Sequence, residues 1–161
     1  MDPAAIITTL TNSTALRTDI SSDNCHITCE IDTTTFIHID LHSQSITSSY
    51  DDKQTTVSTP NATIFRFAIF FRLAPLWRQA EGLKNIHGMH TFSNLETEWT
   101  LRRETPEIPR FIFQNVDDPS LSFSTTNPDT DAVITKASSL DLSALLTAYT
   151  QPEPSHLYAL I

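Results

Sequence analysis

The clearest pattern in the chain is an alternation of apolar and polar residues in two neighbouring segments, residues 25–32 and 36–42. Successive side chains of a β-strand point to opposite faces of its sheet, so each segment is predicted to be a strand with one buried face. The apolar positions are Cys25, Ile27, Cys29, Ile31, Ile37, Ile39 and Leu41. Three threonines at positions 33–35 separate the segments, and we therefore expect a hairpin.

The length of the loop decides which residues of the two strands face each other. A two-residue loop would mix apolar and polar positions, because a slip of one residue inverts a whole strand. A three-residue loop, residues 33–35, pairs Cys29 with Ile39 on the apolar face and Glu30 with His38 on the polar face. We predict this register, although such loops usually contain a glycine and none is present here.

Further strands are expected where β-branched or aromatic residues alternate with polar ones. Residues 45–50 and 54–58 flank a turn and are rich in serine and threonine, so they are predicted to form an exposed ribbon at an edge of the sheet. The most apolar segment, residues 62–74, favours a central strand over a helix because it is rich in aromatic and β-branched residues. The other predicted strands are residues 15–18, 89–92, 95–103, 110–116, 121–125 and 132–135.

Three helices are predicted from capping residues and apolar stripes. Asp2 followed by Pro3 is a typical helix start, so we expect a helix over residues 3–11. Pro75 can begin a second helix, over residues 75–84, and residues 138–150 carry the apolar stripe of a third. The elements together predict one domain, residues 1–161, of the α+β class, with a mostly antiparallel curved sheet of about six to eight strands and two or three helices on one face.

Composition narrows the possible functions. The chain of 161 residues contains only two glycines, Gly82 and Gly88, which excludes the glycine-dependent phosphate loop, dinucleotide fingerprint and nucleophile elbow. Cys25 and Cys29 are predicted to lie on one strand about 13 Å apart, too far for a disulfide. No apolar run is long enough for a membrane span. We expect a protein of the cytosol or nucleus.

Charge is distributed unevenly along the chain. The net charge is -9, yet residues 53–110 contain eight basic and five acidic residues, so this segment is positive between two acidic flanks. Such asymmetry could steer a partner toward one region of the surface. Nucleic-acid binding is not expected, because the chain as a whole is acidic.

The polar face of the first hairpin carries the densest set of candidate metal ligands. His38, Asp40 and His42 alternate along one strand, and imidazole with carboxylate suits Zn²⁺ or non-haem iron. Polar residues also belong on the solvated face of an antiparallel sheet without any function. The pattern therefore predicts either a metal site or an ordinary solvated surface, and we expect no cofactor.

Aromatic residues suggest a second kind of site, a pocket beneath the curved sheet. The candidate lining residues are Phe65, Phe67, Trp99, Phe111 and Phe113. His38, His87 or His90 could orient a ligand there, and the same three histidines are the candidates for catalysis.

Three functions follow from these patterns. The first is a non-catalytic interaction subunit of an intracellular assembly, binding a protein partner or a second copy through an exposed edge strand or the apolar C-terminal segment, residues 151–161. The alternative is a small-molecule-binding protein or cofactor-free enzyme that uses the aromatic pocket. A metal-dependent activity at His38, Asp40 and His42 is the second alternative.

Overall fold

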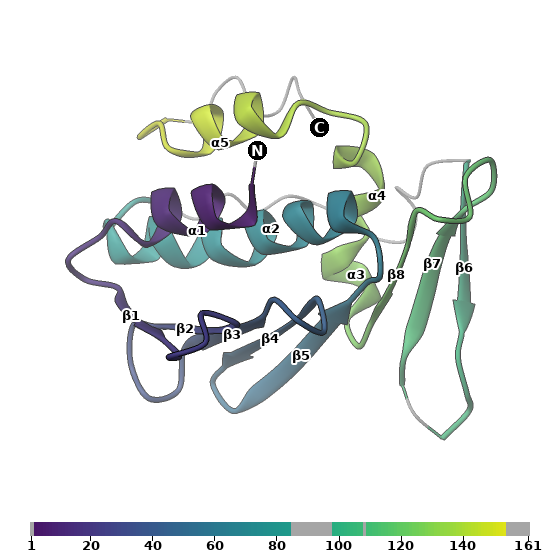
Figure 1. Ribbon diagram of the computed structural model, residues 1–161, viewed down its shortest axis with the longest axis horizontal. Helices are drawn as coiled ribbons and strands as arrows, with labels where there is room; N and C mark the ends of the chain where they lie inside the picture. Colours follow the sequence, from purple (N-terminus) through teal and green to yellow (C-terminus); the bar gives the residue numbers. More distant parts are fainter. Residues whose placement is uncertain (1, 85–97, 108, 154–161) are drawn as a thin grey trace.

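The computed structural model describes residues 2–84, 98–107 and 109–153, and these residues form one antiparallel, curved and unclosed sheet beneath a layer of helices (Figure 1). The strands are β1 (Arg17–Ile20), β2 (His26–Glu30), β3 (Phe36–Asp40), β4 (Ser45–Tyr50), β5 (Lys53–Ser58), β6 (Trp99–Arg103), β7 (Phe111–Asn115) and β8 (Ser122–Thr125). Their order across the sheet is β1-β2-β3-β4-β5-β8-β7-β6. The predicted α+β class is confirmed.

The helices lie on one side of the sheet. They are α1 (Pro3–Thr11), α2 (Ala62–Ala80), α3 (Pro128–Asp131), α4 (Val133–Ala137) and α5 (Leu142–Tyr149). Figure 1 shows α1 and α2 side by side over β1 to β5, with α5 beyond them and α3 and α4 close to β8. As predicted, α1 begins at Pro3, and the Asp2 side chain accepts a hydrogen bond from the Ala4 N–H.

The central element of the fold is α2, where the predicted strand at residues 62–74 is wrong. Asn61 caps this helix, since its side-chain oxygen accepts hydrogen bonds from the N–H groups of Thr63 and Ile64. The helix is buried nearly all round, because the sheet lies below it and α5 above it. Residues on every side of it are therefore apolar, and such a sequence lacks the amphipathic period that normally distinguishes a helix from a strand.

The helix predicted to begin at Pro75 is the second half of α2 rather than a separate element. Its end is a Schellman motif, in which the Gly82 N–H donates to the Gln79 carbonyl and the Leu83 N–H to the Arg78 carbonyl. Gly82 has φ +67, a left-handed conformation that favours glycine. Gly82 is therefore the residue that ends α2.

The first hairpin forms with the predicted faces but a different register. Cys29 pairs with Ile37, and Ile27 with Ile39, a shift of two residues from the expected pairs. The turn is centred one residue earlier because the Asp32 carboxylate accepts hydrogen bonds from the N–H groups of Thr34 and Thr35. An even shift preserves the faces, so the apolar side of the hairpin still lies in the core.

Two further predictions are wrong. β4 and β5 lie in the interior of the sheet rather than at an edge, because β8 pairs with β5 through residues far away in sequence. Residues 133–135 belong to α4, with Ala132 at its N-cap position, rather than to a strand, and the last helix begins at Leu142, with Asp141 as its cap. The strand predicted at residues 89–92 lies outside the described residues.

A single core cluster fills the space between the sheet and the helices. It includes Ile37 and Ile46 from the sheet, Phe70 from α2 and Leu145 from α5, each with no exposed surface. Among the described helices, none is both long enough and apolar enough to cross a membrane.

Candidate functional site

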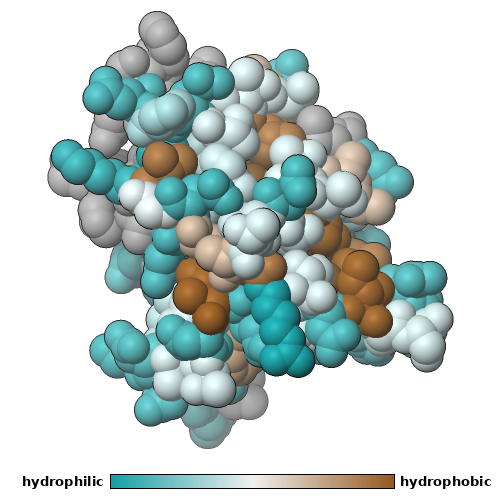
Figure 2. Space-filling view, turned by 90° about the vertical axis from the view of Figure 1, so that its left-hand side faces the viewer, coloured by the Kyte–Doolittle hydropathy of each residue, from teal (hydrophilic) through white to brown (hydrophobic). Residues whose placement is uncertain are grey.

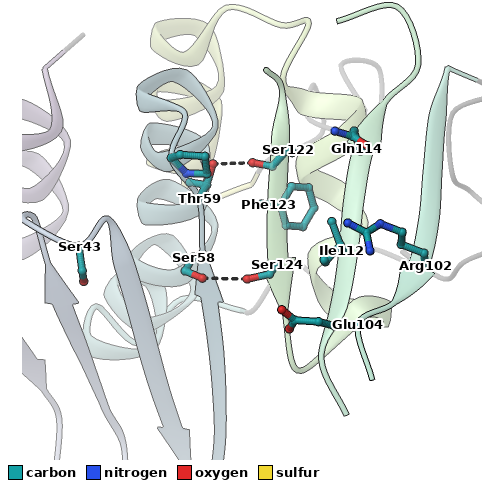
Figure 3. Close-up of a pocket in the computed structure, with 11 residues that line it drawn as sticks. Ser43, Ser58, Thr59, Arg102, Glu104, Ile112, Gln114, Ser122, Phe123 and Ser124 are labelled. Carbon is teal, nitrogen blue, oxygen red and sulfur yellow. Dashed lines mark hydrogen bonds between the residues drawn. The ribbon is translucent and has the colours of Figure 1, made fainter. Parts of the chain in front are cut away.

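The helix-free face of the sheet carries a surface depression formed by β5, β6, β7 and β8. In β5, Val57 is buried in the core while Ser58 points to the opposite face, and β8 repeats this arrangement with Phe123 and Ser124. The resulting groove has a volume of about 450 Å³ and is open to solvent (Figure 3). Its lining residues are Ser43, Ser58, Thr59, Pro60, Arg102, Glu104, Ile112, Gln114, Ser122, Phe123 and Ser124.

The floor of the groove is the seam between β5 and β8. Only two residue pairs form this ladder, Val57 with Thr125 and Ser58 with Ser124. Side chains add to it on the helix-free face. The hydroxyls of Ser58 and Ser124 are 2.8 Å apart, and the Thr59 hydroxyl donates to the Ser122 carbonyl (Figure 3).

The opposite wall of the groove comes from β6 and β7. Arg102 faces Ile112 across this ladder, and Thr100 faces Gln114. The Gln114 amide nitrogen donates to the Pro119 carbonyl at 3.3 Å, which fixes the amide at the rim. Four strands from distant parts of the sequence thus contribute a wall of mainly neutral hydrogen-bonding groups with one cation and one carboxylate.

A buried polar cluster lies under the same seam on the helix side. Arg72 of α2 donates to the Asp131 carboxylate at 2.8 Å and to the Thr55 hydroxyl at 3.0 Å. The Thr125 hydroxyl also donates to Asp131. Burial raises the pKa of the Asp131 carboxyl, although the Arg72 guanidinium and these hydrogen bonds oppose the shift. These contacts connect β5, β8, α2 and α3.

His38, Asp40 and His42, the predicted metal ligands, do not converge. The His38 ring contacts the Thr28 hydroxyl at 3.1 Å and stacks on His26. Asp40 instead accepts hydrogen bonds from the N–H groups of His42 and Ser43, which lower its pKa. Among the described residues, no group of three or more histidine, cysteine, aspartate or glutamate side chains is arranged to hold a metal.

The aromatic residues predicted to line a pocket are dispersed through the core. Phe65 and Phe67 belong to α2, whereas Trp99 belongs to β6 and Phe113 to β7, and all four are buried. Phe113 stacks on Phe123 with 4.7 Å between ring centroids, so packed rings occupy this region. Phe111 is half-buried. His87 and His90, the remaining catalytic candidates, lie outside the described residues.

The edge of the sheet at β1 offers a different kind of surface. β1 is four residues long, and Ile20 at its end is 52% exposed. Figure 2 views the side of the molecule on which β1 lies, and the apolar residues visible there are separated by polar ones. This edge therefore presents scattered apolar side chains, whereas the lining of the groove gathers several hydroxyl and amide side chains.

Comparison with known proteins gives a fold relationship. No family model matches the chain, and no curated protein matches it. A solved structure, Rv3902c from M. tuberculosis, is similar with a TM-score of 0.66 and 10% sequence identity, over 96% of this chain and 90% of that chain. At this identity the similarity shows the shared fold alone.

Sequence reasoning missed the groove because its residues have no chemical signature. Strand alternation predicts that Arg102 points to the opposite face of the sheet from Leu101, which faces the core. It predicts likewise that Ser58 points to the opposite face from Val57. The alternating pattern cannot predict that β5 pairs with β8, and this pairing brings Ser58 next to Ser124.

Proposed function

We propose that this protein is a non-catalytic binding domain that joins an intracellular assembly by contacting another protein through the helix-free face of its sheet. The observation that carries the proposal is the groove over the β5–β8 seam, which is open, hydrogen-bonding and built from four strands. Side chains held on strands give a rigid surface, and a rigid surface loses little entropy when it binds a partner.

The ionisation properties of the described residues favour binding over acid–base catalysis. Backbone hydrogen bonds in turns lower the pKa of Asp32 and Asp40, and burial raises that of Cys29. None of these groups lines the groove. General acid or base catalysis needs a group with a suitably shifted pKa within reach of the substrate.

An intracellular location fits the cysteines. Cys25 and Cys29 are both free thiols, and Cys29 is completely buried in the core. Unpaired cysteines are typical of proteins in reducing compartments.

A second candidate function is small-molecule binding in the same groove. Its volume of about 450 Å³ lies within the range of about 300–1,000 Å³ found for ligand pockets. Such pockets enclose most of their ligand, whereas this groove is open to solvent, so the protein-binding function is preferred.

Site-specific photo-crosslinking in the source cells tests the proposal. A photoreactive amino acid replaces Gln114 in the groove, and in a matched control it replaces the exposed Thr147 on α5. We expect a discrete protein adduct from position 114 that is absent from position 147. The additional substitution Ser124→Arg, which fills the groove, should abolish it.

The proposal fails if position 114 gives no adduct, or if both positions give the same adducts. Circular dichroism of the purified variants establishes that each chain is folded. Native mass spectrometry of the untreated chain distinguishes the small-molecule alternative, which predicts a bound non-protein mass.

A further inference from the structure

Arg102 is a cation at the rim of the groove. It lies on the exposed side of β6, opposite Ile112 in the ladder with β7. Figure 3 shows its guanidinium extending from β6 over Ile112 toward the groove. The planar guanidinium is therefore presented to whatever binds there.

The Arg102 side chain forms no hydrogen bond or ion pair with another described residue, unlike the nearby carboxylate. Glu104, the one acidic residue of the lining, lies 3.6 Å from the Arg110 guanidinium. The charge of Glu104 is therefore partly compensated by Arg110, whereas no described carboxylate forms an ion pair with Arg102. With Arg110 included, the charged groups at the groove are two guanidinium groups and one carboxylate.

The rest of the groove lining supplies donors of the kind that a carboxylate accepts. Ser58, Ser122 and Ser124 carry hydroxyls, and Gln114 carries an amide. A carboxylate bound by an arginine is commonly also held by hydroxyl or amide donors, and charge-assisted hydrogen bonds are about twice as strong as neutral ones.

The charge of the rest of the molecule makes this region selective. The chain carries a net charge of -9, while β6 and the segment that follows it contain Arg102, Arg103 and Arg110 against Glu104 and Glu107. An acidic segment is therefore attracted to these arginines, whereas the chain as a whole repels it. Complementary charge of this kind orients an approaching partner.

We infer that the groove binds a carboxylate-bearing segment of the protein partner, with Arg102 as the residue that anchors an aspartate or glutamate side chain. This inference rests on the proposed function and names the chemistry of the partner. A truncated arginine at such a position typically produces a large loss of affinity, because arginine is enriched among the residues that dominate interfaces.

Selection from a random-peptide display library against the full chain tests the inference. We expect the recovered peptides to be enriched in aspartate and glutamate. Their affinities are then measured by fluorescence anisotropy with synthetic copies of the selected peptides. Arg102→Gln should weaken binding at least about tenfold.

Arg103 provides a matched control. It neighbours Arg102 on β6 and is also exposed, but it faces Phe111 on the other side of the sheet. Arg103→Gln removes the same charge and should change affinity less than about twofold. Arg102→Glu should shift a repeated selection toward peptides that contain lysine or arginine.

Different outcomes separate this inference from the proposed function. If Ser124→Arg blocks binding of the selected peptides while Arg102→Gln has no effect, the groove binds partners but not through a carboxylate, and the inference is overturned. Equal effects of the Arg102 and Arg103 substitutions, or failure to select any peptide, also overturn it. The crosslinking experiment at position 114 judges the proposed function independently.

Discussion

Arg72 and Asp131 form an ion pair beneath the β5–β8 seam, with 2.8 Å between the guanidinium Nη2 and the carboxylate Oδ2. Only 7% of the Arg72 side chain and 2% of the Asp131 side chain are exposed. Thr55 and Thr125 hydrogen-bond to the same two groups from the strands on either side of the seam. The two parts of the sheet are therefore joined through charges that solvent does not reach.

Removing the carboxylate charge should destabilise the fold strongly. Asp131→Asn leaves the Arg72 guanidinium buried without a counter-charge, and we expect a loss of about 3–5 kcal/mol in the free energy of unfolding. Urea denaturation followed by circular dichroism measures it. Asp129→Asn, on the exposed side of the same helix, is the control and should change stability by less than about 0.5 kcal/mol.

The paired substitution Arg72→Met with Asp131→Leu separates the effect of losing the ion pair from the effect of leaving Arg72 buried without a counter-charge. Apolar replacement of a whole buried ion pair is often neutral, so this variant should be clearly more stable than Asp131→Asn. If Asp131→Asn leaves the free energy of unfolding unchanged, the ion pair does not stabilise the β5–β8 seam.

The fully buried Arg78, in the last turn of α2, is expected to be equally important. Its guanidinium donates hydrogen bonds to the carbonyls of Tyr149, Gln151, Pro152 and Lys84. Arg78→Lys keeps the charge but cannot reach all four carbonyls, and should lower the free energy of unfolding by about 3 kcal/mol or more. Arg66→Lys, on the same helix but half-buried, serves as the comparison, and a similar loss there would contradict this explanation.

The turn between β4 and β5 should gain stability from glycine. Asp51 and Asp52 have φ values of 47 and 65, as in the type I′ hairpin turn, and this region is costly for residues with a Cβ. Asp52→Gly is therefore expected to raise the free energy of unfolding by about 1 kcal/mol. Asp117→Gly, in a turn without positive φ, should bring no gain, and thermal unfolding of both variants provides the comparison.

Cys29 should resist thiol reagents and make stability depend on alkaline pH. Burial raises the pKa of its thiol from 9.0 to about 11. The unfolded chain ionises first, so this contribution is complete below about pH 9 and is lost as the pH rises through about 11, at a cost of up to about 3 kcal/mol. At pH 8 iodoacetamide should label Cys25 in the native protein and Cys29 only in urea, as mass spectrometry would show.

Substitution of the buried thiol provides the control for the pH effect. Cys29→Ala removes the ionising group, so the difference in unfolding free energy between wild type and variant should narrow from pH 9 to 11. A constant difference over this interval would contradict the assignment of the effect to Cys29.

The sequence predicted the strands of the hairpins and their buried faces because local alternation determines them. Ile27, Cys29, Ile37 and Ile39 are buried as expected, even though the register differs by two residues. That difference came from Asp32, whose hydrogen bonds to the turn compete with its place in the alternating pattern. Local chemistry of a single side chain moved the turn.

The larger errors arose where distant contacts decide the structure. Residues 62–80 are long for a strand, and their length was the available signal for a helix, but Pro75 divided the pattern into two apparent elements. The position of β5 inside the sheet depends on β8, which no local pattern connects to it. The groove lies on that junction, so its location was not predictable from sequence.

The β5–β8 seam also bears on how the chain reaches its native state. Every other ladder of the described sheet joins strands that follow one another in sequence, whereas Ser58 and Ser124 are separated by 66 positions. Contacts between distant residues carry a larger loop-closure entropy and form more slowly than local ones. We therefore expect the two groups of hairpins to form early and their joining to be the late step, so that the groove exists only once folding is complete.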